Sequence, residues 1–150
     1  MLEITSGTLA QGADLIAELN AELVARSPVD GLNFFSLAPE ELEPARGTFL
    51  IATLDGAAAG CGAVRLIEPE VAEIKRMYTR PTARGQGVGR ALLEALEAEA
   101  WGLGARRLVL ETGPLLHEAL GLYAAAGFTR CACWGEYVAS LHSVCLAKDL

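Results

Sequence analysis

The chain has 150 residues, of which 52% are hydrophobic and 21% charged, and its formal net charge is −7. This length and composition predict one globular domain over residues 1–150, with a sizeable hydrophobic core, and exclude a disordered chain. The acidic balance argues against nucleic acid as the main partner, because phosphate binding needs a broad basic face. No apolar run is long enough to span a membrane, and no signal-peptide pattern opens the sequence, so we expect a cytoplasmic protein with no membrane partner.

The chain contains four cysteines: Cys61, Cys131, Cys133 and Cys145. Cys131 and Cys133 would share one face of a strand, as a zinc-binding pair does. However, no second Cys/His pair lies at ligand spacing, and His117 and His142 are isolated. Free cysteine packs as a small hydrophobic residue, and disulfides are rare in the cytosol. We therefore predict buried, reduced cysteines, no disulfide and no metal site.

In the first half of the chain, alternation and helical spacing predict one strand, two helices and then an antiparallel three-stranded meander. The predicted elements are a strand at 2–5, a helix at 14–26, a loop or broken turn at 29–38, a short helix starting at Pro39, and strands at 48–54, 57–67 and 71–79. Asp55-Gly56 predicts a tight hairpin turn between the first two strands of the meander. Gly60 and Gly62 predict a bulge or close packing in the second.

The second half alternates helices and strands. The predicted elements are a helix at 87–103, a strand at 107–112, a helix at 115–126, and strands at 128–134 and 142–148 joined by a loop at 135–141. Because a helical crossover leads to the strand at 107–112, that strand should pair in parallel. The order of elements predicts a mixed sheet with helices on its faces, which is an α+β or open α/β fold.

The stretch from Glu73 to Ala91 passes from a strand into a helix through Pro81 and glycines at 85, 87 and 89. Five basic side chains and no acidic one lie between Lys75 and Arg90. The first N–H groups of a helix point outward, and the helix dipole favours an anion there. Glycines let the backbone approach that anion closely. The stretch therefore predicts a site for a small phosphorylated ligand.

Two familiar phosphate-binding motifs do not fit this stretch. A dinucleotide-binding loop needs Gly-x-Gly-x-x-Gly, but the third glycine would fall at Arg90 or Leu92, although Glu111 lies at a suitable distance for the ribose contact. The phosphate-binding loop of nucleotide triphosphatases is excluded because the stretch has no Gly-Lys-Ser/Thr.

The stretch does resemble the GNAT-type N-acetyltransferases, whose pyrophosphate loop reads Gln/Arg-x-x-Gly-x-Gly/Ala. Here the motif is Arg84-Gly-Gln-Gly87-Val-Gly89, preceded by Met77-Tyr-Thr79-Arg-Pro81. Leu110-Glu-Thr112 and Leu122-Tyr123-Ala-Ala-Ala-Gly127-Phe128 resemble the fifth strand and fourth helix of that family. The resemblance implies a three-layer α/β/α arrangement with a mixed, mostly antiparallel sheet of about seven strands, splayed fourth and fifth strands, and about four helices.

The resemblance also implies acetyl-CoA as cosubstrate and direct transfer of its acetyl group to an amine in a ternary complex, without a metal. The implied cofactor-binding residues are Met77, Tyr78, Thr79, Arg84, Gly85, Gln86, Gly87, Val88, Gly89 and Arg90. Backbone amides from Gly85 to Arg90 would hold the pyrophosphate, and the backbone of Met77–Thr79 would pair with the pantetheine arm. Many members have an asparagine early in the fourth helix where this chain has Leu116, which puts one cofactor contact in doubt.

For the chemistry, the resemblance implies an acid and a base. Tyr123 falls where the family keeps a tyrosine that can protonate the departing thiolate. Glu73 matches the strand-four glutamate that is the base in the histone-type branch, and Glu111 matches the strand-five glutamate of protein N-terminal acetylating members. Glu73 is preferred, while a water relay that needs neither residue is left open.

The acceptor side is the least determined part of the sequence. By analogy it is lined by residues 26–46, by the strand at 71–79 and by the loop 134–142, where Trp134 and Tyr137 line a pocket or pack in the core. Acidic residues there would attract a cationic amine or would simply be solvated: Asp30, Glu40, Glu41 and Glu43. The acceptor is a small-molecule or peptide amine, and a homodimer is left open. The alternative is a non-catalytic acyl-CoA-binding sensor of the same fold.

Overall fold

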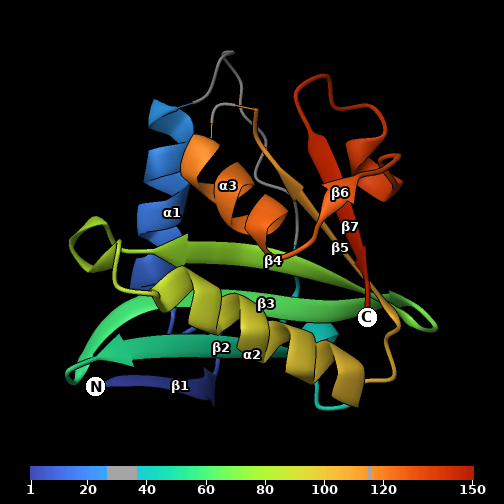
Figure 1. Cartoon of the computed structure of the whole chain (residues 1–150). Helices are drawn as coiled ribbons and strands as arrows, with labels where there is room; N and C mark the ends of the chain where they lie inside the picture. The colour runs from blue at the N-terminus through green and yellow to red at the C-terminus, as the bar shows by residue number, and fades with distance from the viewer. Residues whose placement is uncertain (27–36, 115) are drawn as a thin grey trace.

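The computed structural model of the chain describes residues 1–26, 37–114 and 116–150 (Figure 1). Seven strands form one sheet: β1 (Leu2–Gly7), β2 (Gly47–Leu54), β3 (Ala57–Glu68), β4 (Val71–Thr79), β5 (Arg107–Thr112), β6 (Thr129–Arg130) and β7 (Val144–Asp149). Three α-helices accompany it among these residues: α1 (Ala13–Ala25), α2 (Val88–Gly102) and α3 (His117–Ala125). Short 3-10 turns add η1 (Pro39–Leu42), η2 (Pro81–Ala83) and η3 (Gly135–Tyr137).

The strand order is β1-β2-β3-β4-β5-β7-β6, and every neighbouring pair except β4 and β5 is antiparallel. The parallel pair follows from the crossover through α2, as the sequence predicts. β4 and β5 pair only from Val71 to Ile74, and beyond this point they diverge. The predicted mixed sheet with a splayed fourth and fifth strand is confirmed.

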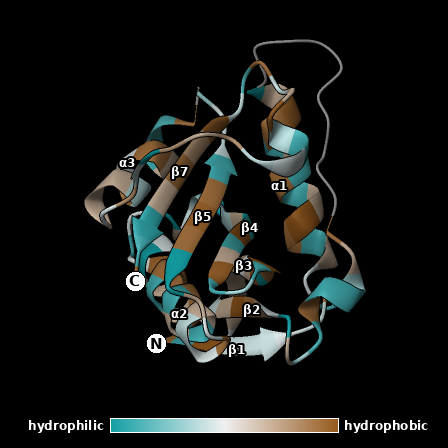
Figure 2. Cartoon of the chain, turned by 90° about the vertical axis from the view of Figure 1, so that its right-hand side faces the viewer, coloured by the Kyte–Doolittle hydropathy of each residue, from teal (hydrophilic) through white to brown (hydrophobic). Residues whose placement is uncertain are grey.

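Helices cover both faces of the sheet. The buried stripe of α2 packs with the inward side chains of the central strands, and it consists of Val88, Leu92, Leu93, Leu96 and Ala100. On the opposite face, Leu15 of α1 packs with Phe49, Cys61 and Tyr78. The hydrophobic middle of β5 lies between these layers (Figure 2). No helix among the described residues is both long enough and apolar enough to cross a membrane.

Several predicted boundaries need correction. The strand expected at 128–134 is only Thr129–Arg130, because Phe128 turns into the core and the chain then leaves the sheet. The helix expected from Pro39 is a single 3-10 turn, so the described part of the chain has three α-helices where four helices were expected. The Asp55-Gly56 turn is confirmed, and both residues have positive φ, at 51° and 84°. The loop predicted at 29–38 lies mostly outside the described residues.

The prediction of reduced cysteines is wrong for one pair. Cys133 and Cys145 form a disulfide, with their Cα atoms 5.3 Å apart. The segment after β6 runs back alongside β7, where the Cys131 N–H donates to the Cys145 carbonyl, and Cys133, two residues further along, forms the bond to Cys145. Cys61 and Cys131 are free. The spacing in the sequence could not show this pairing, because it depends on how two non-adjacent segments align.

We predict that reducing this disulfide destabilises the fold. Its cysteines are separated by 12 residues, and closing a loop of that size stabilises a protein by about 3 kcal/mol. Chemical denaturation with and without a phosphine reductant measures the loss. The variant Cys133→Ser should show the low stability without reductant, whereas the matched variant Cys131→Ser should keep its sensitivity to reductant. Equal stability of oxidised and reduced protein would contradict the prediction.

Candidate functional site

The glycine-rich loop ends at the N-terminus of α2, which no side chain of the described residues caps. Gly87 is the N-cap residue with φ of 83°, and Gly85 has φ of 76°. An L-residue rarely adopts this backbone conformation, so these two positions require glycine. Gly89 is favoured for a different reason: a Cβ there would lie 3.2 Å from a methyl carbon of Leu122. The open N–H groups of the first turn form a ready site for an anion.

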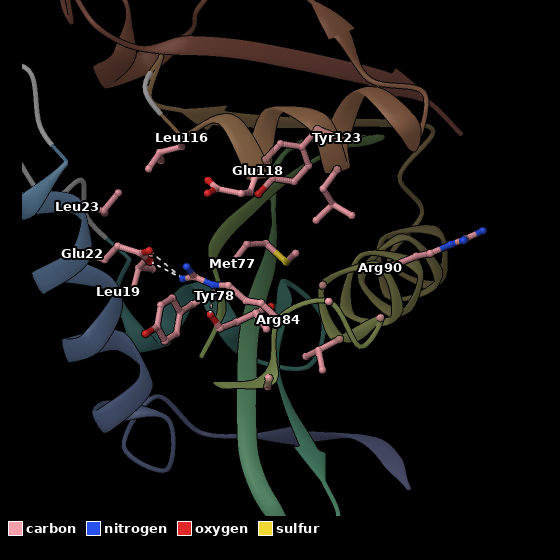
Figure 3. A pocket seen from close by; sticks show the side chains of 18 of the residues that line it. Leu19, Glu22, Leu23, Met77, Tyr78, Arg84, Arg90, Leu116, Glu118 and Tyr123 are labelled. Carbon is pink, nitrogen blue, oxygen red and sulfur yellow. Dashed lines mark hydrogen bonds and ion pairs between the residues drawn. The ribbon is translucent and has the colours of Figure 1, made fainter. Parts of the chain in front are cut away.

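A cavity of about 380 Å³ opens beside this helix terminus, between α1, the end of β4 and α3 (Figure 3). Its walls include most of the predicted cofactor-binding residues: Met77, Tyr78, Thr79, Arg84, Gly85, Gly87, Val88, Gly89 and Arg90. Leu116 lines it as well, at the N-cap of α3. Gln86 does not line the cavity, because its side-chain amide donates to the Thr82 carbonyl within the loop.

The positive charges of the loop are paired with glutamates of α1. Nη2 of Arg84 lies 2.8 Å from both carboxylate oxygens of Glu22, and the two side chains meet across the cavity in Figure 3. Arg80 makes a similar pair with Glu18, at 2.8 Å. Arg90 instead points away from the cavity and pairs with Glu94 on the surface. Of the predicted basic contacts, only Arg84 therefore directs its guanidinium into the cavity.

β4 contains a bulge at the point where it leaves β5. Arg76 has φ of 58°, and the β3–β4 register shifts between Cys61 and Ala63, opposite this residue. The Cys61 thiol donates to the Arg76 carbonyl at 3.3 Å, which ties the bulge to β3. Beyond Ile74, the β5-facing edge of β4 has no strand partner among the described residues. This edge, Met77–Thr79, borders the cavity, and the Thr79 carbonyl accepts from Nε of Arg84 at 3.0 Å.

On the α1 face of the sheet, a buried ion network surrounds Glu73. Glu73 is fully buried, and its Oε1 accepts from Nε and Nη2 of Arg65 at 3.0 and 2.8 Å. Nη1 of Arg65 also pairs with Glu41 of η1. Oε2 of Glu73 has no hydrogen-bond partner in the described part of the chain. One oxygen of this carboxylate is thus held by a cation, and the whole side chain is shielded from solvent.

Next to this network lie Lys75, Glu136 and Tyr137. Lys75 is buried, and its Nζ lies 3.5 Å from Glu136 and 5.7 Å from the ring centre of Tyr137. Burial lowers the pKa of the Lys75 ammonium, although the charge of Glu73 opposes this. Burial and then the charge of Glu73 raise the pKa of Tyr137. Trp134 packs edge to face on Tyr137, with ring centres 5.3 Å apart, so this aromatic pair is part of the packing.

Glu111 lies at the end of β5, where β4 and β5 separate. Ser143 Oγ donates to Glu111 Oε2 at 2.6 Å. Burial raises the pKa of Glu111; the hydrogen bond from Ser143 opposes this shift, and the charge of Glu73 adds to it. The two candidate bases are therefore close enough to interact, but their surroundings differ: Glu73 faces an arginine and Glu111 a hydroxyl.

Tyr123 of α3 closes the inner end of the cavity. It is buried and packs edge to face on Phe128, with ring centres 5.9 Å apart. Burial raises the pKa of Tyr123, and the charge of Glu111 is the second cause. The hydroxyl therefore stays protonated and is available as a donor. Tyr123 thus lines the cavity and feels the charge of Glu111, whereas neither candidate base, Glu73 or Glu111, is among the residues that line it.

Sequence reasoning missed Arg65, Ser140 and Ser143. Arg65 did carry a signal, because it is a lone charge in an otherwise apolar stretch of β3. The serines carried none. Asp30 lies outside the described residues. No group of three or more His, Cys, Asp or Glu side chains is placed to hold a metal in the parts of the chain described.

Comparison with known proteins identifies the family. The model of the acetyltransferase (GNAT) family matches residues 15–128, most of the chain. The chain belongs to the GNAT acetyltransferase family. This confirms the resemblance seen in the loop motif, and as a GNAT protein the chain is an acyltransferase of the N-acetyltransferase class.

Individual relatives are similar to this chain over most or all of its length. An IAA acetyltransferase of Azospirillum brasilense is 36% identical over 91% of this chain and 88% of its own. A crystal structure described as an acyl-CoA N-acyltransferase from Klebsiella pneumoniae is 33% identical, has a TM-score of 0.83, and is matched over 100% of this chain and 98% of its own. A Salmonella typhimurium structure with acetyl-CoA shares the fold, with a TM-score of 0.75 at 17% identity over 100% and 94% of the two chains.

We predict that Glu111→Gln stabilises this GNAT protein at neutral pH. Because the folded state raises the pKa of Glu111, the carboxyl group contributes stability below its unfolded pKa and loses that contribution as the pH rises through the folded pKa. Near neutral pH the ionised carboxylate of Glu111 therefore lowers the free energy of unfolding, and the uncharged glutamine removes this cost. Urea unfolding near pH 7 should show a gain that shrinks toward about pH 4, whereas the exposed control Glu3→Gln should show neither. A loss of stability at both pH values would contradict this assignment.

Proposed function

We propose that this chain is an acetyl-CoA-dependent N-acetyltransferase that transfers the acetyl group directly to an amine in a ternary complex. The observation that carries the proposal is the cavity itself. It runs from the uncapped N-terminus of α2 past the unpaired edge of β4 to the buried hydroxyl of Tyr123. A phosphate site, an extended edge and a proton donor thus follow one another along a single cavity, in the order in which a CoA thioester presents its parts.

The fit to CoA rests on two backbone features. The amides of the first turn of α2 and the glycine loop suit the pyrophosphate, with Arg84 as the nearby cation. The edge of Met77–Thr79 offers backbone groups that lack a strand partner, and these suit the amide groups of pantetheine. Arg90 would contribute through its backbone, since its guanidinium faces solvent. Acetyl-CoA supplies the thioester, and a structure of the same fold contains acetyl-CoA.

For the proton acceptor we propose Glu111 rather than Glu73. An amine is mostly protonated at neutral pH and must lose a proton before it attacks. A carboxylate in which burial raises the pKa is suited to accept that proton. The charge of Glu111, but not that of Glu73, is among the causes that raise the pKa of Tyr123, which supports Glu111 as the base that acts with this tyrosine. Glu73 would then attract the cationic acceptor through its charge, as it acts on the neighbouring Lys75 ammonium.

Tyr123 is the proposed donor to the departing sulfur. Its hydroxyl stays protonated because burial and the Glu111 charge raise its pKa. When Glu111 accepts the proton of the amine, its charge disappears and one of these two causes is removed. Acceptance of a proton by Glu111 therefore makes Tyr123 a better donor at the moment when the thiolate needs a proton.

We predict that CoA and acetyl-CoA stabilise the protein and that Glu22→Gln strengthens the effect. A ligand at 100 times its Kd stabilises a protein by about 2.7 kcal/mol, which a thermal shift assay detects. The Glu22 carboxylate occupies the Arg84 guanidinium that a phosphate would use, so its removal should tighten CoA binding about two- to five-fold, the worth of a partly exposed ion pair.

The control for CoA binding is Glu3→Gln, which makes the same change in net charge on β1, away from the cavity, and should leave CoA affinity unchanged. Weaker CoA binding by Glu22→Gln would show that Glu22 instead holds Arg84 in place. Stabilisation by NAD and not by CoA would overturn the assignment of the cavity.

We predict that Tyr123→Phe and Glu111→Gln each lower kcat by about 100-fold, within the range typical of a lost acid or base, while CoA binding is kept. A panel of small-molecule and peptide amines, assayed by release of free thiol, first identifies an acceptor. Glu73→Gln should then raise the KM for that amine more than it lowers kcat. Wild-type kcat in Glu111→Gln would exclude Glu111 as the base. If no amine yields free thiol although CoA binds, the chain is a CoA-binding sensor.

A further inference from the structure

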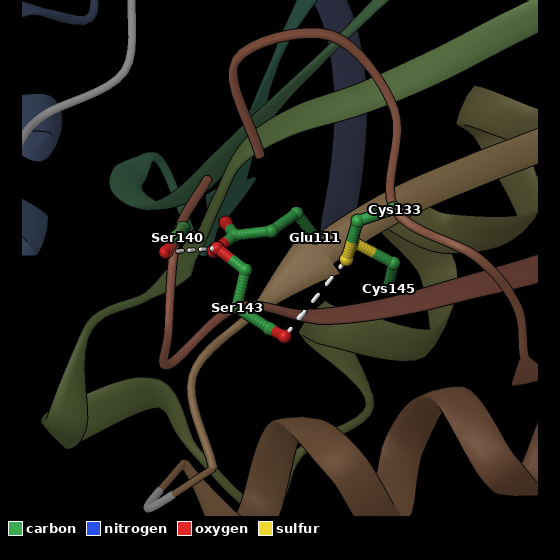
Figure 4. The surroundings of a disulfide bond; sticks show 5 residues. All are labelled: Glu111, Cys133, Ser140, Ser143 and Cys145. Carbon is green, nitrogen blue, oxygen red and sulfur yellow. Dashed lines mark hydrogen bonds between the residues drawn. A yellow bond between two sulfur atoms is a disulfide. The ribbon is translucent and has the colours of Figure 1, made fainter. Parts of the chain in front are cut away.

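Two serines connect Glu111 to the surface of the protein. Ser143 Oγ lies 2.6 Å from Glu111 Oε2 and 2.7 Å from Ser140 Oγ, so the three groups form one continuous chain (Figure 4). Ser140 is partly buried, and it stands between residues 138–139 and 141–142, all of which are exposed. The chain thus starts at a partly buried carboxylate and ends in an exposed loop.

The direction of these hydrogen bonds follows from counting protons. A serine hydroxyl has one proton to donate but can accept two hydrogen bonds. While Glu111 is ionised it can only accept, so Ser143 donates to Glu111 and Ser140 must donate to Ser143. All donors then point toward the carboxylate. When Glu111 is protonated, it becomes a donor and every bond in the chain can reverse.

We propose that Ser143 and Ser140 are positioning residues that orient Oε2 of Glu111 and conduct its proton to solvent. The inference rests on the proposed role of Glu111 as the proton acceptor. After the amine has transferred its proton, the O–H of Glu111 donates to Ser143, the proton of Ser143 passes to Ser140, and that of Ser140 passes to water. One proton leaves Glu111 and one reaches solvent, and the carboxylate is restored for the next turnover without another reactant.

The other groups around Glu111 do not offer this route. Glu73 and Lys75 of β4 face it, and both are buried. Glu136 of η3 also interacts with Glu111, but it pairs with Lys75. The phenols of Tyr123 and Tyr137 feel the Glu111 charge, and each is buried. Ser143 donates a hydrogen bond to the Glu111 carboxylate and has a further hydroxyl, that of Ser140, behind it.

The disulfide fixes the backbone that carries Ser143. Cys145 is the partner of Glu111 in the β5–β7 ladder, and its bond to Cys133 ties β7 to the segment after β6. Sγ of Cys133 lies 3.9 Å from the Ser143 carbonyl oxygen, a packing contact because a disulfide sulfur carries no proton. Ser143 therefore lies two residues before Cys145, which is fixed both by its ladder pair with Glu111 and by the disulfide to Cys133. This suits a residue whose hydroxyl must keep one position.

The test is the pH dependence of kcat in Ser143→Ala, with acetyl-CoA and the best amine of the panel. Because the hydrogen bond from Ser143 favours the ionised carboxylate, its loss should move the acid limb of the profile to higher pH and lower kcat about ten-fold, with the KM for acetyl-CoA unchanged. Ser143→Thr, which keeps the hydroxyl, should restore both. Ser140→Ala, on the loop side of the chain, should lower kcat without moving the acid limb as far.

Controls separate this proposal from the function on which it rests. Ser6→Ala, on exposed β1, should behave as the wild type. If Glu111→Gln keeps full activity, the proposal that Glu111 is the proton acceptor is wrong. If Glu111→Gln is inactive but Ser143→Ala and Ser140→Ala keep the wild-type kcat and pH profile, the serine chain alone is overturned. A lower melting temperature of Ser143→Ala with an unmoved profile also overturns it, and should Ser143→Ala not fold, Ser140→Ala decides by the same kcat measurement.

Discussion

The separation of β4 from β5 is the constraint on which the site depends. β4 is paired with β3 along most of its length, but with β5 only from Val71 to Ile74. The bulge at Arg76 turns the rest of β4 away from its parallel neighbour, and the loop and α2 follow that direction. An inner strand of a sheet rarely leaves backbone groups unpaired, because each one costs free energy when it is buried. The edge of Met77–Thr79, where the Thr79 carbonyl accepts from Arg84, has no strand partner on its β5 side among the described residues and lies beside the uncapped terminus of α2, which supports the proposed pantetheine site.

The basic residues that precede and form the glycine loop do not give the folded site a matching positive charge. The run of five basic residues between Lys75 and Arg90 predicts an electropositive loop. In the folded protein, Glu18 and Glu22 of α1 neutralise two of these residues, and Arg90 pairs with Glu94. The remaining positive character at the loop comes from the helix terminus rather than from free side chains. The glycines are therefore a stronger indication of the phosphate site than the arginines. The positive φ angles of Gly85 and Gly87 create the turn that exposes the amides.

Prediction from sequence was accurate where local pattern decides structure. The bounds of β4 and β5, the Asp55-Gly56 turn and the buried stripe of α2 all follow from spacing over a few residues, and the loop motif located the cavity. It failed where distant segments meet. Arg65 reaches Glu73 only because β3 and β4 pair in that register, and Cys133 reaches Cys145 only because β6 ends after two residues. Nothing local marks a serine such as Ser143 as the partner of a glutamate 32 residues earlier.

Two carboxylates near one reacting centre can be assigned different roles from their surroundings. Glu73 is fully buried and Arg65 holds one of its oxygens, so loss of the Glu73 charge would leave this partly buried arginine with one anionic partner fewer. Glu111 instead accepts from the neutral hydroxyl of Ser143, and burial favours its neutral form, although the charge of Lys75 opposes that shift. Protonation of Glu111 also removes the repulsion between the two carboxylates, because the charge of Glu73 helps to raise its pKa. The surroundings therefore favour Glu111 for the proposed cycle of proton uptake and release, while Glu73 is held in its ion pair with Arg65.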